Sequence, residues 1–227
     1  TTIAKFCLPG TCPVGQEVEM EDNYREVKKA EPCLKLIHMD QVEVEEIEWL
    51  FYPFIPYGKV TIIQGDPGEG KTTVVLQIIA KLTKGEPILN EITEEETGVK
   101  PINVIYQTAE DGLGDTIKPR LLAAGADCSR VLVIDDQDQP LTMVDARLEE
   151  AIIQTKARLV VLDPIQGFLG TGVDMHRANE IRPLMKRISV LAEKYQCAII
   201  LIGHMNKNSN GKSSYRGLGS IDFQAAA

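Results

Sequence analysis

The segment at residues 65–72 constrains the fold of this chain more than any other. It reads Gly-Asp-Pro-Gly-Glu-Gly-Lys-Thr, with two glycines five positions apart followed by Lys71 and Thr72. The apolar run before it, residues 59–64, predicts a buried strand, and residues 74–82 after it carry apolar side chains at helical spacing. The segment therefore lies between a strand and a helix, as a phosphate-binding loop requires.

The residue types in this loop suit a nucleoside triphosphate bound with Mg²⁺. Its glycines permit a tight backbone whose N–H groups converge on phosphate oxygens, and the helix N-terminus adds partial positive charge. Lys71 supplies a full positive charge and Thr72 a hydroxyl for the metal. The alternative, a glycine-rich turn that only starts a helix, leaves the eight-residue match unexplained. The predicted nucleotide-contacting residues are Gly65, Asp66, Pro67, Gly68, Glu69, Gly70, Lys71, Thr72 and Thr73.

Composition defines the class of protein that carries this loop. The chain has 227 residues, 44% apolar and 25% charged, which is ordinary for a globular protein with room for one α/β domain. No apolar run approaches the ~18 residues of a membrane span, and no charged-then-apolar leader opens the sequence. The five cysteines are an odd number in a chain too large to need disulfides, so reduced thiols are expected. We therefore expect a cytoplasmic protein that does not enter a membrane.

Residues 1–48 are predicted to form an acidic lead, separate from a nucleotide-binding domain at 49–227. Residues 1–58 hold eleven acidic and five basic side chains, and they supply most of the net charge of −9. That balance argues against a surface that coats nucleic acid non-specifically, but it leaves a local loop or pore open. Residues 34–39 are compatible with a strand. Residues 49–57 concentrate five aromatic side chains, for which a packing role is favoured over a base-stacking platform.

The cysteines fall into two groups. Cys7, Cys12, Cys33 and His38 follow a C-x4-C-x20-C-x4-H spacing that a zinc ion could use, but C-x2-C pairs are absent. Unligated thiols are therefore the favoured interpretation of this group. Cys128 and Cys197 are expected to fill the core.

Two predicted strands lead into carboxylates. Residues 102–108 run into Glu110 and Asp111, and residues 159–162 lead directly to Asp163. The carboxyl ends of parallel strands line the ligand crevice of an α/β sheet, so these side chains are expected near the phosphate loop. Asp163 is predicted to support Mg²⁺, and Glu110 is the candidate catalytic carboxylate with Asp111 as fallback. Either of the last two residues could instead cap the helix that follows. The other expected elements are helices at 115–124, 145–155 and 181–195 and strands at 131–134 and 198–203.

The strand at 198–203 ends at His204, which is predicted to sense the nucleotide from the same edge of the sheet. Ser209 stands two residues after Lys207, where a GTPase would carry an aspartate that reads guanine. GTP is therefore disfavoured as the nucleotide.

These features occur in an order that resembles one family. The loop at 65–72, the acids at 109–111, the Asp163-Pro164 pair and the Gly203-His204 pair, with Arg-Leu-Leu-Ala-Ala-Gly at 120–125 between them, resemble the RecA-like ATPases. The resemblance is greatest to the RepA-type hexameric helicases of plasmids and mobile elements, and it covers residues 49–227. It implies a mostly parallel sheet flanked by helices, with the phosphate-loop strand beside the His204 strand. The Asp163 strand, the Glu110 strand and the 131–134 strand follow in that order, and family members continue into strands beyond residue 227.

The resemblance also implies roles for single residues. Lys71 and Thr72 hold phosphate and Mg²⁺, and Asp163 supports the metal. Glu110 activates the attacking water, and His204 senses the γ-phosphate. Arg216 falls where the family carries an arginine finger that reaches a neighbouring subunit, although the interval from His204 is short for that family. The partners implied are single-stranded DNA and further copies of the chain in a hexameric ring. The loops at 167–179 and 205–219 are expected to face the DNA and to be highly exposed.

The sequence therefore predicts a Mg²⁺-dependent RecA-like ATPase, and from the resemblance a helicase that replicates a plasmid, prophage or other mobile element. The alternative is an ATP-gated regulator or recombination mediator that carries the same site without unwinding DNA. A kinase-like transferase would need an acceptor site and a lid, and the sequence shows neither.

Overall fold

A computed structural model describes residues 34, 36–88, 100–175 and 177–204. The chain divides into two units, residues 1–44 and residues 45–227. In the first unit, the described residues hold a short 3₁₀ helix, Met39–Gln41. The expected strand at 34–39 is wrong for residues 36–39, which form coil and the start of that helix. The side chains of Leu36, Ile37 and Met39 are exposed, so no buried face stabilises an extended pairing there.

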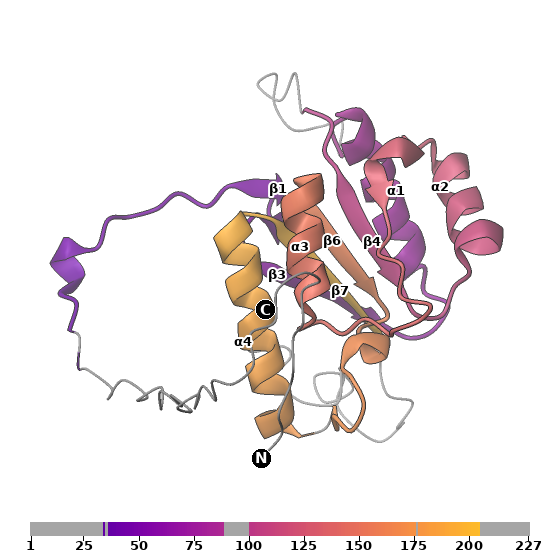
Figure 1. Cartoon of the computed structure of the whole chain (residues 1–227). Coiled ribbons are helices and arrows are strands. Elements are labelled where there is room, and N and C mark those ends of the chain that lie inside the picture. The colour runs from indigo at the N-terminus through magenta and orange to yellow at the C-terminus, as the bar shows by residue number, and fades with distance from the viewer. Residues whose placement is uncertain (1–33, 35, 89–99, 176, 205–227) are drawn as a thin grey trace, which may run out of the picture. The chain divides into compact units, whose positions relative to one another are not determined.

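The second unit is built on a parallel sheet in the order β3-β7-β6-β4-β5 (Figure 1). Its strands are β3 (Val60–Gly65), β4 (Val104–Thr108), β5 (Val131–Leu132), β6 (Leu159–Asp163) and β7 (Ala198–His204). Every neighbouring pair is parallel. The expected strand order is therefore confirmed, and the fold is an α/β fold of the RecA-like P-loop type.

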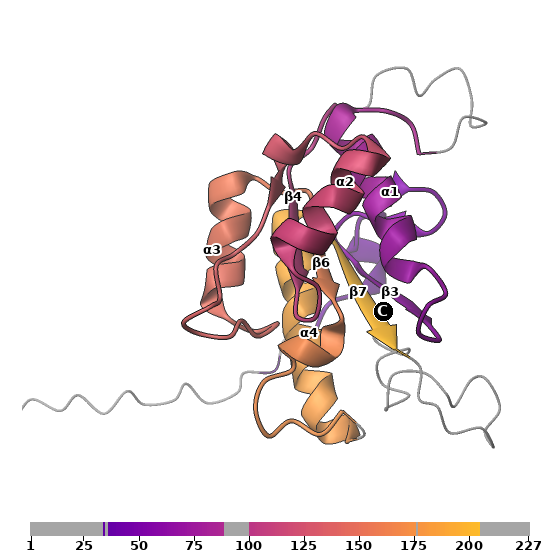
Figure 2. The same cartoon turned by 90° about the vertical axis from the view of Figure 1, so that its right-hand side faces the viewer.

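Helices cover both faces of this sheet (Figures 1 and 2). They are α1 (Lys71–Lys84), α2 (Lys118–Ala124), α3 (Ala146–Thr155) and α4 (Ala178–Tyr195). Side chains of α1 and α2 pack in one buried cluster with Leu159 and Val161, whereas those of α3 and α4 pack in another with Val160 and Leu162. Successive residues of β6 thus face opposite layers, and because both layers are covered the strand is apolar throughout.

The helix ends follow local chemistry. α1 ends where Gly85 takes a left-handed conformation (φ 70°) and donates to the Leu82 carbonyl, as the Lys84-Gly85 pair predicts. α3 begins after Asp145, whose carboxylate accepts the Arg147 N–H at 2.9 Å. The helix expected from residue 115 is instead a π-helical turn, Leu113–Ile117, followed by α2.

Strand β5 is two residues shorter than the expected 131–134. The cause is the buried amide of Gln107, which donates to the Ile134 carbonyl at 2.8 Å and accepts from the Ile134 N–H at 3.0 Å. A side chain of β4 thereby occupies the backbone groups that a longer ladder would have paired. The sheet edge is held by this contact where main-chain pairing stops.

The aromatic segment forms a hairpin of β1 (Trp49–Phe51) and β2 (Ile55–Pro56). Ile55 is buried and Phe51 packs against the cluster beneath α1, which agrees with the packing interpretation. Tyr52 and Phe54 near the hairpin turn are exposed and do not share that role.

Both described cysteines are free. Cys197 is buried, and burial raises the pKa of its thiol to about 11, whereas Cys128 is half-buried. Cys7, Cys12 and Cys33 lie outside the described residues, so the zinc interpretation stays a prediction. None of the described helices is long and apolar enough to cross a membrane.

Candidate active site

The strand register brings the predicted site residues to one edge of the sheet. Gly65 at the end of β3 pairs with His204 at the end of β7, and Thr108 at the end of β4 pairs with Asp163 at the end of β6. Since all these strands are parallel, their carboxyl ends point to the same edge (Figure 2). Residues that are far apart in the sequence thus meet at one edge of the sheet, where parallel sheets typically bind ligands.

The phosphate loop has the backbone that its glycines predict. Gly68 and Gly70 have φ values of 86° and 84°, in the left-handed region that residues with a Cβ rarely adopt. α1 starts directly after Gly70, and no side chain hydrogen-bonds its N-terminal N–H groups as a cap. These N–H groups are a ready site for an anion.

Lys71 lies folded over the loop. Its Nζ donates to the carbonyls of Gly65 at 2.9 Å and Asp66 at 2.8 Å. An ammonium group has three donors, so these two bonds hold the loop and leave one donor for a phosphate oxygen. Lys71 is therefore both a structural clamp of the loop and a charge beside its N–H groups.

Glu69 places a carboxylate inside the same loop. Its Oε2 accepts the Asp66 N–H at 2.7 Å, and a Cβ added at Gly65 would collide with it. From the sequence, Glu69 is expected only as one position of the loop, and this contact is not predicted. The available signal is the charge itself, since an acid in an anion-binding loop opposes the incoming phosphates unless it has a local partner.

Thr72, Asp163 and Tyr106 form a connected group next to the loop. The Thr72 hydroxyl donates to Asp163 Oδ2 at 2.7 Å, and the Tyr106 hydroxyl donates to the same oxygen at 2.8 Å. Asp163 is 6% exposed and Tyr106 is fully buried. Burial, and then the neighbouring Asp163 carboxylate, raise the pKa of Tyr106, so its hydroxyl stays protonated and donates.

Tyr106 is the residue of this group that was not predicted from the sequence. A signal was present, because a tyrosine inside the apolar run 102–108 needs a hydrogen-bond partner once it is buried.

Glu110 and His204 lie close together at this edge of the sheet. The distance from His204 Nε2 to Glu110 Oε2 is 3.5 Å, and the Glu110 side chain is 64% exposed. Asp111, the fallback acid, instead lies 3.5 Å from Arg120 Nη1. Glu110 is thus the acid that faces the nucleotide-sensing candidate, whereas Asp111 is turned toward an arginine.

Gln166 contacts the end of β7 at His204. Its Nε2 donates to the His204 carbonyl at 3.4 Å. Within the part of the chain that the structure describes, Gln166 Oε1 and His204 Nδ1 are buried without a hydrogen-bond partner. Unpaired buried polar atoms are uncommon, and here they lie beside the predicted phosphate site.

These groups fit Mg²⁺ bound with a nucleotide. Thr72 and Asp163 offer hard oxygen atoms, and Mg²⁺ in nucleotide sites typically takes one or two protein oxygens while phosphates and waters supply the rest. Among the described residues, no cluster of three or more His, Cys, Asp or Glu forms a separate metal site.

The first predicted DNA-facing loop, 167–179, is only partly exposed. Phe168 and Leu169 are buried in the core beneath α4, which contradicts the high exposure expected of the whole segment. Residues 170–172 are exposed, and the side chain of Glu180 accepts the Asp174 N–H at 2.7 Å. The second loop, 205–219, lies outside the described residues, as does Arg216.

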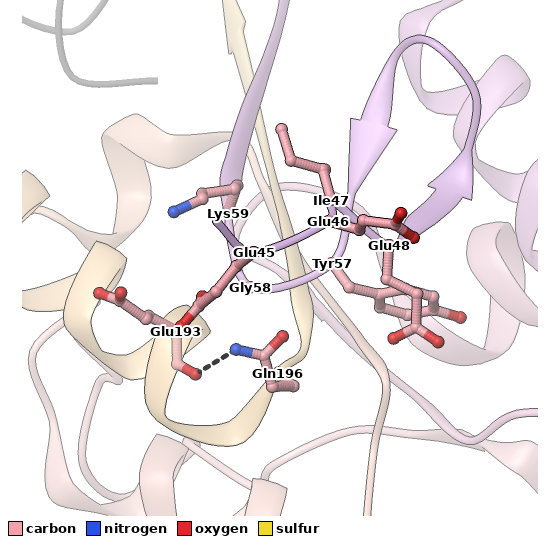
Figure 3. A pocket seen from close by; sticks show the side chains of 9 residues that line it. All are labelled: Glu45, Glu46, Ile47, Glu48, Tyr57, Gly58, Lys59, Glu193 and Gln196. Carbon is pink, nitrogen blue, oxygen red and sulfur yellow. Dashed lines mark hydrogen bonds between the residues drawn. The ribbon is translucent and has the colours of Figure 1, made fainter. Parts of the chain in front are cut away.

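A separate cavity of about 630 Å³ lies at the opposite edge of the sheet (Figure 3). It is bordered by Gly58 and Lys59 just before β3 and by Gln196 just before β7. Its lining holds four glutamates against one lysine: Glu45, Glu46, Glu48 and Glu193, with Lys59. Such a lining repels phosphate, so this cavity is not a second triphosphate site.

The sequence also matches a known protein family. A family described as an AAA domain matches residues 27–210, which contain the phosphate loop, Tyr106, Glu110, Asp163 and His204. The chain belongs to this family.

Two curated proteins illustrate the similarity of this AAA domain to known sequences. DNA repair protein RadA of Mycobacterium tuberculosis (strain ATCC 25618 / H37Rv) is 26% identical over 168 residues, which are 73% of this chain and 31% of that protein. DNA repair protein RadA of Streptococcus pneumoniae (strain ATCC BAA-255 / R6) is 23% identical over 181 residues, 80% of this chain and 38% of that protein. The chain thus spans about a third of the length of these relatives. Together with the strand order, they support a RecA-like P-loop ATPase domain.

Proposed function

We propose that this AAA domain binds ATP with Mg²⁺ and hydrolyses it. The observation that carries the proposal is the Thr72–Asp163 hydrogen bond beside the uncapped N-terminus of α1. Lys71 and the loop N–H groups bind the β- and γ-phosphates, and Thr72 and Asp163 hold the metal, directly or through its water ligands. Bound Mg²⁺ neutralises charge on the phosphates.

Glu110 accepts a proton from the attacking water, or orients that water, at the γ-phosphate. The exposed Glu110 side chain supports this assignment over Asp111, which lies 3.5 Å from Arg120, because an acid already engaged by an arginine is a poorer base. His204 contacts the γ-phosphate and couples its binding to Glu110. The distance from His204 Nε2 to Glu110 Oε2 is 3.5 Å.

We further propose that hydrolysis is coupled to single-stranded DNA. The names of the two relatives, both DNA repair proteins, support a nucleic-acid substrate, and so does the resemblance to ring-shaped helicases. In this proposal the exposed residues 170–172 and the segment 205–219 face the DNA, Arg216 reaches the site of a neighbouring subunit, and six chains form a ring. The function is then a cytoplasmic replicative helicase of a plasmid, prophage or other mobile element.

A second candidate function is an ATP-gated recombination mediator or regulator that binds DNA without unwinding it. Its specific support is that both relatives are named for repair and neither for replication. The same ATP site serves both candidates, so the site residues do not distinguish them.

One experiment separates these functions. Phosphate release is measured with and without single-stranded DNA, and strand separation is measured on a forked duplex in parallel. A helicase gives DNA-stimulated hydrolysis and strand separation, both lost in Glu110→Gln. Stimulated hydrolysis without strand separation supports the mediator, and absence of hydrolysis in both conditions contradicts the proposed ATPase.

A further inference from the structure

Two hydroxyl groups donate hydrogen bonds to the same oxygen of the Asp163 carboxylate. Thr72 approaches Oδ2 from the start of α1 at 2.7 Å, and Tyr106 approaches it from β4 at 2.8 Å. β4 and β6 are adjacent strands, and Tyr106 pairs with Val161 in their register, two residues before Asp163. The Tyr106 hydroxyl thus reaches the Asp163 carboxylate from the neighbouring strand β4, whereas the Thr72 hydroxyl reaches it from α1.

Two donors on one oxygen fix the orientation of a carboxylate. Neither the Tyr106 ring, which is fully buried, nor Asp163, which is 6% exposed, has room to rotate freely. No described residue hydrogen-bonds Asp163 Oδ1, so the two hydrogen bonds to Oδ2 leave Oδ1 available to accept from a metal-bound water. Thr72 also serves the metal, whereas Tyr106 acts on Asp163 alone.

We propose that Tyr106 is a positioning residue for the magnesium site, because its hydroxyl holds Asp163 Oδ2 and so presents Oδ1 to the hydration shell of Mg²⁺. This inference rests on the proposed function. It assigns to Tyr106 an effect on the metal-dependent part of nucleotide binding and not on the loop contacts that bind phosphate. Hydrogen-bond partners of metal-binding groups commonly change metal affinity by 10- to 100-fold when they are removed.

A purely structural role would also explain the hydrogen bond, since a buried hydroxyl needs a partner. The two roles differ in what they predict for Tyr106→Phe. Loss of packing or stability affects nucleotide binding with and without metal, whereas loss of carboxylate orientation affects only binding with metal.

The chain offers a matched control. Tyr195, the last residue of α4, also donates to a carboxylate, that of Glu149 in the first turn of α3, at 2.7 Å. Tyr195→Phe therefore removes the same kind of bond outside the site. The full chain and both variants are titrated with a fluorescent methylanthraniloyl-ATP, once in EDTA and once over a series of Mg²⁺ concentrations.

We expect Tyr106→Phe to bind the analogue in EDTA within about twofold of the parent. At saturating nucleotide, the Mg²⁺ concentration that gives half of the Mg²⁺-dependent fluorescence change should rise about tenfold or more. Tyr195→Phe should match the parent in both conditions. The inference is overturned if Tyr106→Phe keeps the parental Mg²⁺ dependence, or if it loses binding equally in EDTA and in Mg²⁺. Failure of the parent itself to bind the analogue, or to respond to Mg²⁺, would instead contradict the proposed function.

Discussion

Thr72 and Asp163 are 91 residues apart in the sequence, and the Thr72 hydroxyl donates a 2.7 Å hydrogen bond to Asp163 Oδ2. The bond joins the first turn of α1 to the end of β6, although β7 lies between β6 and the phosphate-loop strand. The helix proposed to bind phosphate and the carboxylate proposed to support Mg²⁺ are therefore held in one arrangement before a nucleotide binds. Such pre-organisation lowers the cost of assembling the site on binding.

Thr72→Val should weaken the Mg²⁺-dependent part of ATP binding by at least tenfold, because it removes a metal ligand and the bond to Asp163 while keeping the side-chain shape. Isothermal titration with Mg²⁺ and with EDTA measures the two parts separately. Thr155→Val is the control, since the Thr155 hydroxyl bonds the Ala151 carbonyl within α3. Equal Mg²⁺ dependence in Thr72→Val and the parent would remove Thr72 from the metal site.

His204→Asn should lower kcat by about 10²-fold, the usual cost of losing a donor that stabilises transition-state charge. ATP affinity should stay within a few-fold of the parent, because Lys71 and the loop remain intact. Steady-state kinetics together with equilibrium binding test this. A variant with parental kcat would show that the 3.5 Å contact with Glu110 has no catalytic role.

Glu69→Gln should tighten ATP binding by about two- to fivefold, because it removes a negative charge close to the incoming phosphates. The glutamine carbonyl still accepts the Asp66 N–H, so the loop contact at 2.7 Å is kept. The gain should shrink as salt is raised, since salt screens the repulsion. Unchanged affinity at low and high salt would show that Glu69 is already neutralised by its surroundings.

Asp145→Asn should flatten the acid limb of the stability curve. Hydrogen bonds from the Arg147 side chain, then from its N–H, hold the pKa of Asp145 below its usual range. A lowered folded-state pKa stabilises the fold at a pH above the unfolded value near 4, and that contribution is lost as pH falls through the folded pKa. Urea unfolding from pH 7 to pH 3 measures the slope. Glu150→Gln, an exposed change on the same helix, should leave it unaltered.

Much of the fold was accessible from sequence because its central strands are buried on both faces. The apolar runs ending at Asp163 and His204 mark β6 and β7 without ambiguity, and the resemblance supplied the strand order. The sheet edge and the connecting segments were harder to predict, because single side chains determine there where strand pairing stops and which residues are buried. Gln107 ends the β5 ladder by bonding Ile134, and Phe168 turns a Gly-containing segment into core.

The candidate site could likewise be predicted from the sequence only in part. Motif spacing predicts Lys71, Thr72 and Asp163 as site residues because their proposed chemistry is tied to the phosphate loop. Spacing does not reveal that the Tyr106 hydroxyl reaches Asp163, since that depends on the register of β4 against β6. Nor does it reveal that Glu69 folds back on the Asp66 N–H, which is a property of the loop conformation.

The most direct test of the account compares Lys71→Ala with Glu110→Gln for ATP binding and phosphate release under the same Mg²⁺ concentration. Lys71→Ala should lose triphosphate binding, because it removes the positive charge beside the loop. Glu110→Gln should bind ATP like the parent and lose turnover by about 10²- to 10⁴-fold, since a base acts in the transition state and not in ground-state binding. Parental hydrolysis by Glu110→Gln would pass the role to Asp111 or another acid, and parental ATP binding by Lys71→Ala would contradict the nucleotide site itself.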